Sequence, residues 1–254
     1  MKLLLFDLDG TLLHHDKTLS ERTIKTLERC REQGYILGIA TARGEYSIGR
    51  FIDAFKPKVI ISNSGAQVRA YGEKVYTASF PVSETRRILG LIKEICGDNN
   101  IMVDTDGREY RNFIYTGDRL GWDWGEIVID DFSDFNVEAL KICTEIPDPE
   151  VAQRMINAIP EYYCGRYSDG FWHEIGKKEV TKAYGVEKLC ETGLFNLEDI
   201  TAFGDEFTDI GMLKLCGTGV AMGNAIPETK EAADIVIGTN EEDGVAEYLE
   251  TLLA

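Results

Sequence analysis

Six short runs of apolar residues punctuate the chain, and each run is continuous instead of alternating with polar positions. Continuous apolar runs of this length are typical of parallel strands whose two faces are both covered by helices. We therefore predict buried parallel strands over residues 2–7, 35–40, 58–62, 199–203, 219–222 and 234–237.

Helical patterns fill most of the intervals between these strands. Ser20 can cap a helix that runs to Arg31, and Gly34 stands just past its end. Segments 45–54 and 181–192 show the same kind of pattern. Strands that alternate with helices predict an α/β fold with a doubly wound, Rossmann-like parallel sheet.

Between residues 82 and 180 this rhythm breaks. The pattern there predicts helices over 83–96 and 149–158, and short strands over 101–104, 109–115, 126–129, 138–145, 161–167 and 170–175. The serine, aspartate and glycine at 168–170 are a hairpin signal between the last two strands. We therefore expect a discontinuous core domain, residues 1–81 and 181–254, with an inserted α/β domain over 82–180.

The composition narrows the range of partners. The net charge is −17 and the hydrophobic fraction is 44%, so the chain can bury a core but repels nucleic acids and anionic membranes. We see no secretory signal and no apolar run long enough to span a membrane. The six scattered cysteines fit reduced thiols in a cytoplasmic protein. An anionic substrate would require a local positive patch or a metal ion.

Polar residues follow five of the predicted strands. The segments are DLDGT at 7–11, TAR at 41–43, NSG at 63–65, GDEFTD at 204–209 and GN at 223–224. Because ligands bind beyond the carboxyl ends of parallel strands, Asp7, Asp9, Asp205 and Asp209 should gather at one edge of the sheet. Four carboxylates repel one another unless a cation joins them. Oxygen ligands favour a hard divalent cation, and we predict Mg²⁺.

These segments resemble the haloacid dehalogenase superfamily, and specifically its Cof-like phosphatases, which carry a large inserted cap of type C2. The resemblance covers essentially the whole chain, in order. The motifs are DLDGTLL at 7–13, TAR at 41–43, the lysine of VTKA at 182, GDEFTD at 204–209 and AMGNA at 221–225. The resemblance implies a Rossmann-like catalytic core, and it makes the inserted domain the cap.

The resemblance also assigns roles to the aspartates. Asp7 matches the nucleophile, which would form an aspartyl-phosphate, and Asp9 matches the general acid/base. Asp205 matches a direct magnesium ligand, joined by Asp7 and the backbone carbonyl of Asp9. Asp209 would assist through a bound water or by orienting Lys182.

Three further residues match the family's phosphate-binding positions: Lys182, the hydroxyl of Thr41 and the backbone amide of Ala42. Arg43 and Asn224 are candidates for contacts with the substrate or with the groups behind the site. Two positions depart from the family pattern. Ala183 replaces a glycine. Thr208 stands where the family usually has an asparagine, which raises the question of whether activity is weakened.

The implied substrate is a small phosphate monoester: a sugar phosphate, a nucleotide or a phosphorylated cofactor. Candidate cap contacts are Arg108, Arg111, Arg119, Arg166, His173 and Glu174. Two alternatives stay open at this point. One is phosphoryl transfer within a sugar, as in the superfamily's mutases. The other is a catalytically weak regulator that binds a phosphorylated metabolite, for which Thr208 is the support. The sequence leaves a monomer or a dimer equally open.

Overall fold

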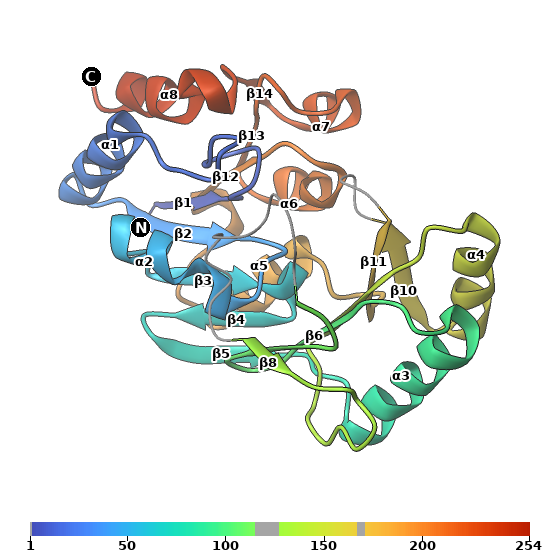
Figure 1. Cartoon of the computed structure of the whole chain (residues 1–254). Helices are drawn as coiled ribbons and strands as arrows, with labels where there is room; N and C mark the ends of the chain where they lie inside the picture. The colour runs from blue at the N-terminus through green and yellow to red at the C-terminus, as the bar shows by residue number, and fades with distance from the viewer. Residues whose placement is uncertain (1, 115–126, 167–170) are drawn as a thin grey trace. The chain divides into compact units, whose positions relative to one another are not determined.

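The computed structural model describes residues 2–114, 127–166 and 171–254, without the side chains of residues 50 and 52. Two compact units make up the chain. The first unit comprises Met1–Arg43, Gly49–Thr77 and Thr181–Ala254. The second unit comprises Gly44–Ile48 and Ala78–Val180. Each unit has its own sheet (Figure 1).

The first unit contains an eight-stranded sheet in the order β14-β13-β12-β1-β2-β3-β4-β5. Its strands are β1 (Leu3–Phe6), β2 (Ile36–Ala40), β3 (Val59–Ser62), β4 (Gln67–Ala70), β5 (Glu73–Thr77), β12 (Ile200–Gly204), β13 (Thr218–Ala221) and β14 (Ile235–Val236). The six strands predicted from the apolar runs pair in parallel throughout, which confirms the doubly wound α/β class.

The hairpin of β4 and β5 is an addition that the apolar pattern did not predict. Both strands pair antiparallel, and Tyr71 and Gly72 make the turn between them with φ of 54° and 86°. Most of β5 is exposed at the edge of the sheet. An exposed edge strand carries no continuous apolar run, so the pattern that revealed the other strands is missing here.

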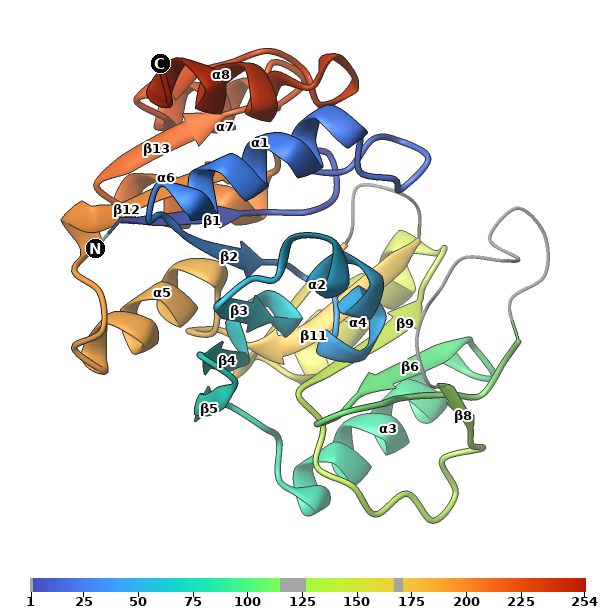
Figure 2. The same ribbon diagram turned by 90° about the vertical axis from the view of Figure 1, so that its left-hand side faces the viewer.

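Helices cover both faces of this sheet. They are α1 (Glu21–Glu32), α2 (Gly49–Phe55), α5 (Lys182–Glu191), α6 (Ile210–Leu215), α7 (Pro227–Ala232) and α8 (Gly244–Leu252). Helix α1 lies beside α8, and α5 packs against α6 (Figures 1 and 2). Right-handed crossovers on either side of β1 send α1 and α6 to opposite faces. As predicted, Ser20 caps α1: its hydroxyl accepts a hydrogen bond from the backbone of Thr23.

Short 3₁₀ turns connect several of these elements. They are η1 (Glu45–Ile48), η2 (Asn63–Gly65), η3 (Leu197–Asp199), η4 (Phe207–Asp209) and η5 (Asn240–Glu242). The predicted helix over 45–54 is therefore a 3₁₀ turn followed by the short α2, and these two segments fall in different units.

The second unit contains a six-stranded sheet in the order β10-β11-β9-β6-β7-β8. Its elements are α3 (Val82–Cys96), β6 (Ile101–Asp104), β7 (Glu109–Arg111), β8 (Ile127–Ile129), β9 (Lys141–Glu145), α4 (Pro149–Ala158), β10 (Tyr162–Arg166) and β11 (Trp172–Lys177). Strands β10 and β11 pair antiparallel, as the hairpin signal requires. The predicted turn at 168–170 and the candidate Arg119 lie outside the described residues.

One face of this second sheet forms a hydrophobic core with α3 and α4, which lie side by side. Val103 and Ile142 belong to that core. Because side chains alternate along a strand, the neighbouring Asp104 and Lys141 project from the opposite face. Both are nevertheless buried, so this second face carries buried charge.

All six cysteines are free thiols. In the described part of the chain, no helix has both the length and the apolar character needed to cross a membrane.

Candidate active site

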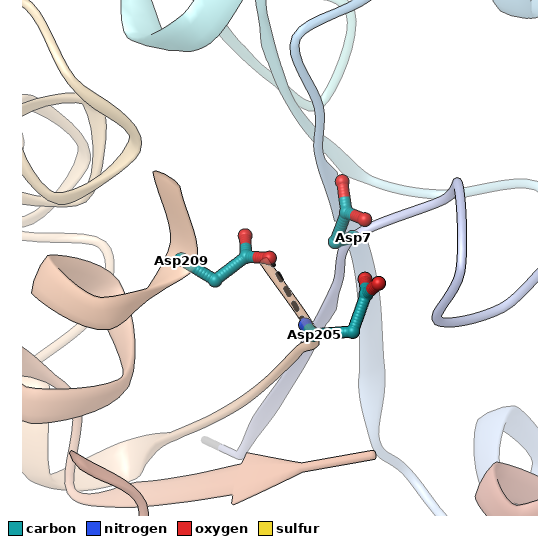
Figure 3. A group of neighbouring side chains, drawn as sticks. All are labelled: Asp7, Asp205 and Asp209. Carbon is teal, nitrogen blue, oxygen red and sulfur yellow. Dashed lines mark hydrogen bonds between the residues drawn. The ribbon is translucent and has the colours of Figure 1, made fainter. Parts of the chain in front are cut away.

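The carboxyl ends of three neighbouring parallel strands carry the candidate site. Asp7 follows β1, Thr41 follows β2 and Asp205 follows β12. In the sheet β12 pairs with β1, and β1 pairs with β2. Asp209 joins them from η4, and Figure 3 shows Asp7, Asp205 and Asp209 with their carboxylates gathered in one place. The strand-end prediction therefore brings these three aspartates together.

Lys182 lies among these carboxylates. It is the first residue of α5, whose preceding Thr181 caps the helix by accepting a hydrogen bond from the backbone of Tyr184. The Lys182 Nζ lies 2.6 Å from Asp7 Oδ1 and 2.6 Å from Asp209 Oδ1. The side chain is buried, so the helix start delivers one fixed positive charge to the cluster.

Burial and mutual repulsion raise the pKa of two of these acids. The pKa of Asp7 lies well above its usual value because the carboxyl is buried and faces Asp209 and Asp205; Lys182 opposes this shift. The pKa of Asp205 rises from 3.8 to about 7, first through burial and then through Asp209. One lysine therefore does not balance the three carboxylates.

Asp209 uses its second oxygen to shape the turn that follows β12. Its Oδ2 accepts hydrogen bonds from the backbone N–H groups of Asp205, at 3.0 Å, and Glu206, at 3.1 Å. A Cβ at Gly204 would lie 2.4 Å from the Asp209 Cβ, so the glycine lets the chain pass this close. With one oxygen on Lys182 and the other on the backbone, Asp209 orients the residues around it.

The loop after β1 is folded tightly against Asp205. The carbonyl of Leu8 accepts hydrogen bonds from the backbone N–H groups of Thr11, Leu12 and Leu13. Gly10 has a φ of 80°, and a Cβ there would lie 2.2 Å from Asp205 Oδ2, so only glycine fits. The Thr11 hydroxyl donates to Asp205 Oδ1 at 2.8 Å. These features explain the glycine and threonine of the DLDGT run.

Asp9 lies apart from the carboxylate cluster, between two cations. Arg43 binds it with two nitrogens: Nε lies 2.6 Å from Asp9 Oδ2 and Nη2 lies 2.8 Å from Oδ1. The Lys17 Nζ lies 2.7 Å from Asp9 Oδ1. Although burial opposes the shift, Arg43 and Lys17 hold the pKa of Asp9 well below its usual range. Sequence reasoning missed Lys17, and its only local signal was its place in the turn that follows the first motif.

The remaining predicted residues take different positions. Thr41 is buried, and its hydroxyl accepts a hydrogen bond from the backbone of Arg43 at 3.1 Å. Ala42 lies between these two residues, in the same loop. Thr208 is exposed in η4. Asn224 is also exposed, and its side-chain amide donates to the carbonyl of Gly10 at 2.8 Å, which places it behind the first motif.

Asn63 lies at the end of β3, beside the second motif. Its backbone N–H donates to the carbonyl of Arg43 at 2.8 Å, and its φ is 51°. The next residue, Ser64, donates its N–H to the carbonyl of Thr41 at 3.1 Å. The NSG segment thus supports the loop that carries Thr41 and Arg43.

The cluster of acids fits a hard metal ion. Asp7, Asp205 and Asp209 each offer a carboxylate oxygen, and these oxygens lie within 4.8 Å of one another. All three residues are buried, and buried like charges at this spacing require a cation. All the donors are carboxylate oxygens, the ligands that suit hard cations such as Mg²⁺, Ca²⁺ and Mn²⁺.

Comparison with known proteins shows the family to which the chain belongs. Residues 4–249 match the family model described as haloacid dehalogenase-like hydrolase. The chain belongs to this family. Within it, the chain is of the Cof-like type, and it is an enzyme of the phosphatase class.

Several known proteins are similar to this chain over almost their whole length. The 5-amino-6-(5-phospho-D-ribitylamino)uracil phosphatase YitU of Bacillus subtilis is 31% identical, covering 97% of this chain and 96% of its own. The pyridoxal phosphate phosphatase YbhA of Escherichia coli is 28% identical, covering 98% and 97%. A haloacid dehalogenase-like hydrolase from Bacteroides thetaiotaomicron has a TM-score of 0.87 at 26% identity, covering 99% of each chain.

Proposed function

We propose that this enzyme is a Mg²⁺-dependent phosphatase that hydrolyses small phosphate monoesters through a phosphorylated Asp7. One observation carries the proposal: the Asp7 carboxylate is buried beside a single lysine and two further acids. This arrangement combines an anionic nucleophile with an excess of negative charge that a divalent cation would offset.

In the first step, an oxygen of Asp7 attacks the phosphorus atom of the substrate. A bond forms between that oxygen and phosphorus, and the bond from phosphorus to the leaving oxygen breaks. A carboxylate needs no base to act as nucleophile when it is ionised. Lys182, at 2.6 Å from Asp7, favours its ionised form and places a positive charge where the transferred group carries its negative charge.

Asp9 handles the protons in this proposal. In the first step it would give a proton to the leaving oxygen, which requires Arg43 and Lys17, the cations that lower its pKa, to move off its carboxylate when substrate binds. In the second step it takes a proton from the water that attacks the phosphorylated Asp7, so that inorganic phosphate leaves and the carboxylate is restored. Its position two residues after Asp7, on a loop pinned to Asp205 through Thr11, supports this role.

Asp7, Asp205 and the backbone carbonyl of Asp9 would hold the magnesium ion. Asp209 would act mainly through Lys182, because both its oxygens already accept hydrogen bonds. When bound, Mg²⁺ would neutralise the phosphoryl oxygens and lower the barrier to attack by an anionic nucleophile.

The phosphoryl oxygens would be bound by Lys182, Thr41 and the backbone amide of Ala42. We assign the first unit as the catalytic core and the insertion as the cap that selects the leaving group. Five of the named cap candidates lie in the described part of the second unit: Arg108, Arg111, Arg166, His173 and Glu174.

Relatives are named for a phosphorylated ribityl compound and for pyridoxal phosphate, which supports a small phosphorylated metabolite as substrate. The six free thiols are in keeping with a reducing cytoplasm.

Phosphate release from 4-nitrophenyl phosphate and a panel of phosphorylated metabolites tests the proposal. The purified enzyme should turn over with Mg²⁺ and lose activity in EDTA. Asp7→Asn should reduce kcat by a factor on the order of 10⁴ to 10⁶. Asp53→Asn makes the same chemical change at an exposed position of α2 and should keep full activity. An Asp7→Asn variant with normal turnover would refute the mechanism.

A further inference from the structure

Two asparagines near the C-terminus bind the loop of the first motif from behind. The Asn224 side-chain amide donates to the carbonyl of Gly10 at 2.8 Å. The Asn240 side-chain amide donates to the carbonyl of Leu13 at 2.8 Å. The two asparagines are themselves joined, because the backbone N–H of Asn240 donates to Asn224 Oδ1 at 3.0 Å. We call this set of three bonds the asparagine clamp.

The clamp connects parts of the chain that are far apart in sequence. Asn224 lies in the turn after β13, and Asn240 is the first residue of η5. The backbone N–H of Gly223 donates to the carbonyl of Gly238 at 3.0 Å, which holds the two asparagine segments side by side. Asn240 is buried, so its hydrogen bond to the loop is shielded from water.

The two clamped carbonyls belong to Gly10, inside the tight turn after Asp9, and to Leu13, at the end of that turn. Within that turn the backbone N–H groups converge on the carbonyl of Leu8. The carbonyls of Gly10 and Leu13 point instead to the clamp. The turn is therefore fixed from the inside by its own backbone and from the outside by two side chains.

The loop beyond the turn is attached to the same C-terminal segment. His14 Nε2 lies 3.1 Å from Asp243 Oδ1, and the backbone N–H of His15 donates to Glu241 at 2.6 Å. This part of the loop carries Lys17, which reaches Asp9 at 2.7 Å with its backbone in the left-handed region. The position of Lys17 on Asp9 thus depends on a loop held along its length by residues 224–243.

We propose that Asn224 and Asn240 are positioning residues for the reaction. They do not contact the reacting atoms in this proposal. They fix the turn that contains Asp9 and so hold its carboxylate where it can protonate the leaving oxygen. The inference rests on the proposed function, since it assumes that Asp9 is the general acid.

Position 224 requires an amide side chain, whereas position 240 uses only the donor of its amide. Asn224 donates to one carbonyl and accepts from a backbone N–H, and only an amide side chain of this length does both. An aspartate there would place an oxygen against the Gly10 carbonyl, and an alanine would leave both partners without their bond.

The test uses Asn224→Ala, Asn240→Ala and the double variant, with Asn196→Ala as the control. Asn196 lies exposed before η3, where its amide binds Asp199, so the control removes an asparagine amide away from the first motif. Kinetics are measured with 4-nitrophenyl phosphate, whose phenolate leaves readily, and with the alkyl esters pyridoxal 5′-phosphate and ribose 5-phosphate.

For the alkyl esters, whose leaving oxygen needs a proton, kcat should fall at least about tenfold in each single variant. For 4-nitrophenyl phosphate, kcat should change less than about threefold. The KM values of the variants should match that of the unmodified enzyme. The control Asn196→Ala should keep both kcat and KM. Because both asparagines act on one turn, the double variant should lose little more than the worse single variant. An equal loss for both substrate types, or multiplicative losses in the double variant, would overturn the proposal.

Hydrogen exchange provides a readout that does not depend on turnover. Backbone amides of residues 8–18 should exchange faster in both single variants than in the unmodified enzyme and in Asn196→Ala. Unchanged protection would overturn the clamp whatever the kinetics show. If the unmodified enzyme releases no phosphate from any ester, the proposed function fails, while the exchange data still decide whether the clamp holds the loop.

Discussion

In the second unit, buried charges meet in opposite pairs. Lys141 Nζ lies 3.0 Å from Asp104, and Arg111 pairs with Glu109. The hydroxyl of Tyr46 lies within hydrogen-bonding distance of both Asp104 and Glu109, and its single proton is donated to one of these carboxylates at a time. In the first unit, one buried lysine faces a cluster of three buried aspartates, two of which have raised pKa values.

The two units thus differ in how their buried charges are balanced. In the second unit each buried charge has a partner of opposite sign, whereas in the first unit negative charges remain in excess. In a buried ion pair each charge neutralises the other, and the two stabilise each other once both are desolvated. A cluster with an excess of one sign costs folding free energy until an ion of the other sign arrives. The excess of carboxylates in the first unit supports the proposed site, whereas the paired charges of the second unit leave no such excess.

The largest expected effect is on the free energy of unfolding and concerns the paired charges of the second unit. Lys141→Met leaves the buried Asp104 without its cation and should lower the free energy of unfolding by about 3–5 kcal/mol. Asp7→Asn removes one of the excess acids, so in EDTA it should cost nothing or stabilise the protein. Lys25→Met, which removes an exposed partner of Glu21, should change stability by less than about 0.5 kcal/mol.

Urea unfolding followed by circular dichroism measures these differences. A Lys141→Met variant as stable as Lys25→Met would show that the second unit does not depend on its charge pairs. A large loss of stability in Asp7→Asn would show that the cluster of the first unit is already balanced.

The next effect concerns metal binding and pH. Because the pKa of Asp205 is raised from 3.8 to about 7, the folded protein keeps a proton that the unfolded chain loses. In EDTA, stability should therefore fall as the pH rises from about 4 to 7. Mg²⁺ competes with that proton, so it should raise Tm more at pH 8 than at pH 5. At 100 times Kd the gain should be about 2.7 kcal/mol.

Differential scanning fluorimetry at both pH values, with Mg²⁺ or EDTA, checks this expectation. Asp205→Asn should lose most of the dependence on Mg²⁺ and flatten the slope with pH. An equal Mg²⁺ effect at pH 5 and pH 8 would contradict the assignment of the excess charge to a metal site.

The smallest effect concerns the departure from the family pattern. Thr208 is exposed in η4, outside the buried cluster. Thr208→Asn should therefore change kcat/KM by less than about threefold, or about 0.7 kcal/mol. Steady-state kinetics with 4-nitrophenyl phosphate measure it. A gain of tenfold or more would show that this position belongs to the site and that the threonine weakens the enzyme.

Most of the core could be predicted because its signals are local. Each parallel strand is a continuous apolar run. The rule that ligands bind at the carboxyl ends of parallel strands also predicted that Asp7 and Asp205 lie at the same edge of the sheet. The resemblance to the family added Lys182. The β4–β5 hairpin was not predicted, since an exposed edge strand has no continuous apolar run.

The sequence alone predicted the order of the parallel strands, the meeting of Asp7, Asp205 and Asp209 at the sheet edge and the family to which the chain belongs. Only the tertiary structure decided which partners those acids have. Lys17 and Arg43 on Asp9, and Asn240 on Leu13, depend on turns and crossovers that join residues as many as 227 positions apart. The physical reason is that apolar periodicity reports which face of an element is buried, whereas a hydrogen bond or ion pair depends on where two finished elements place single atoms.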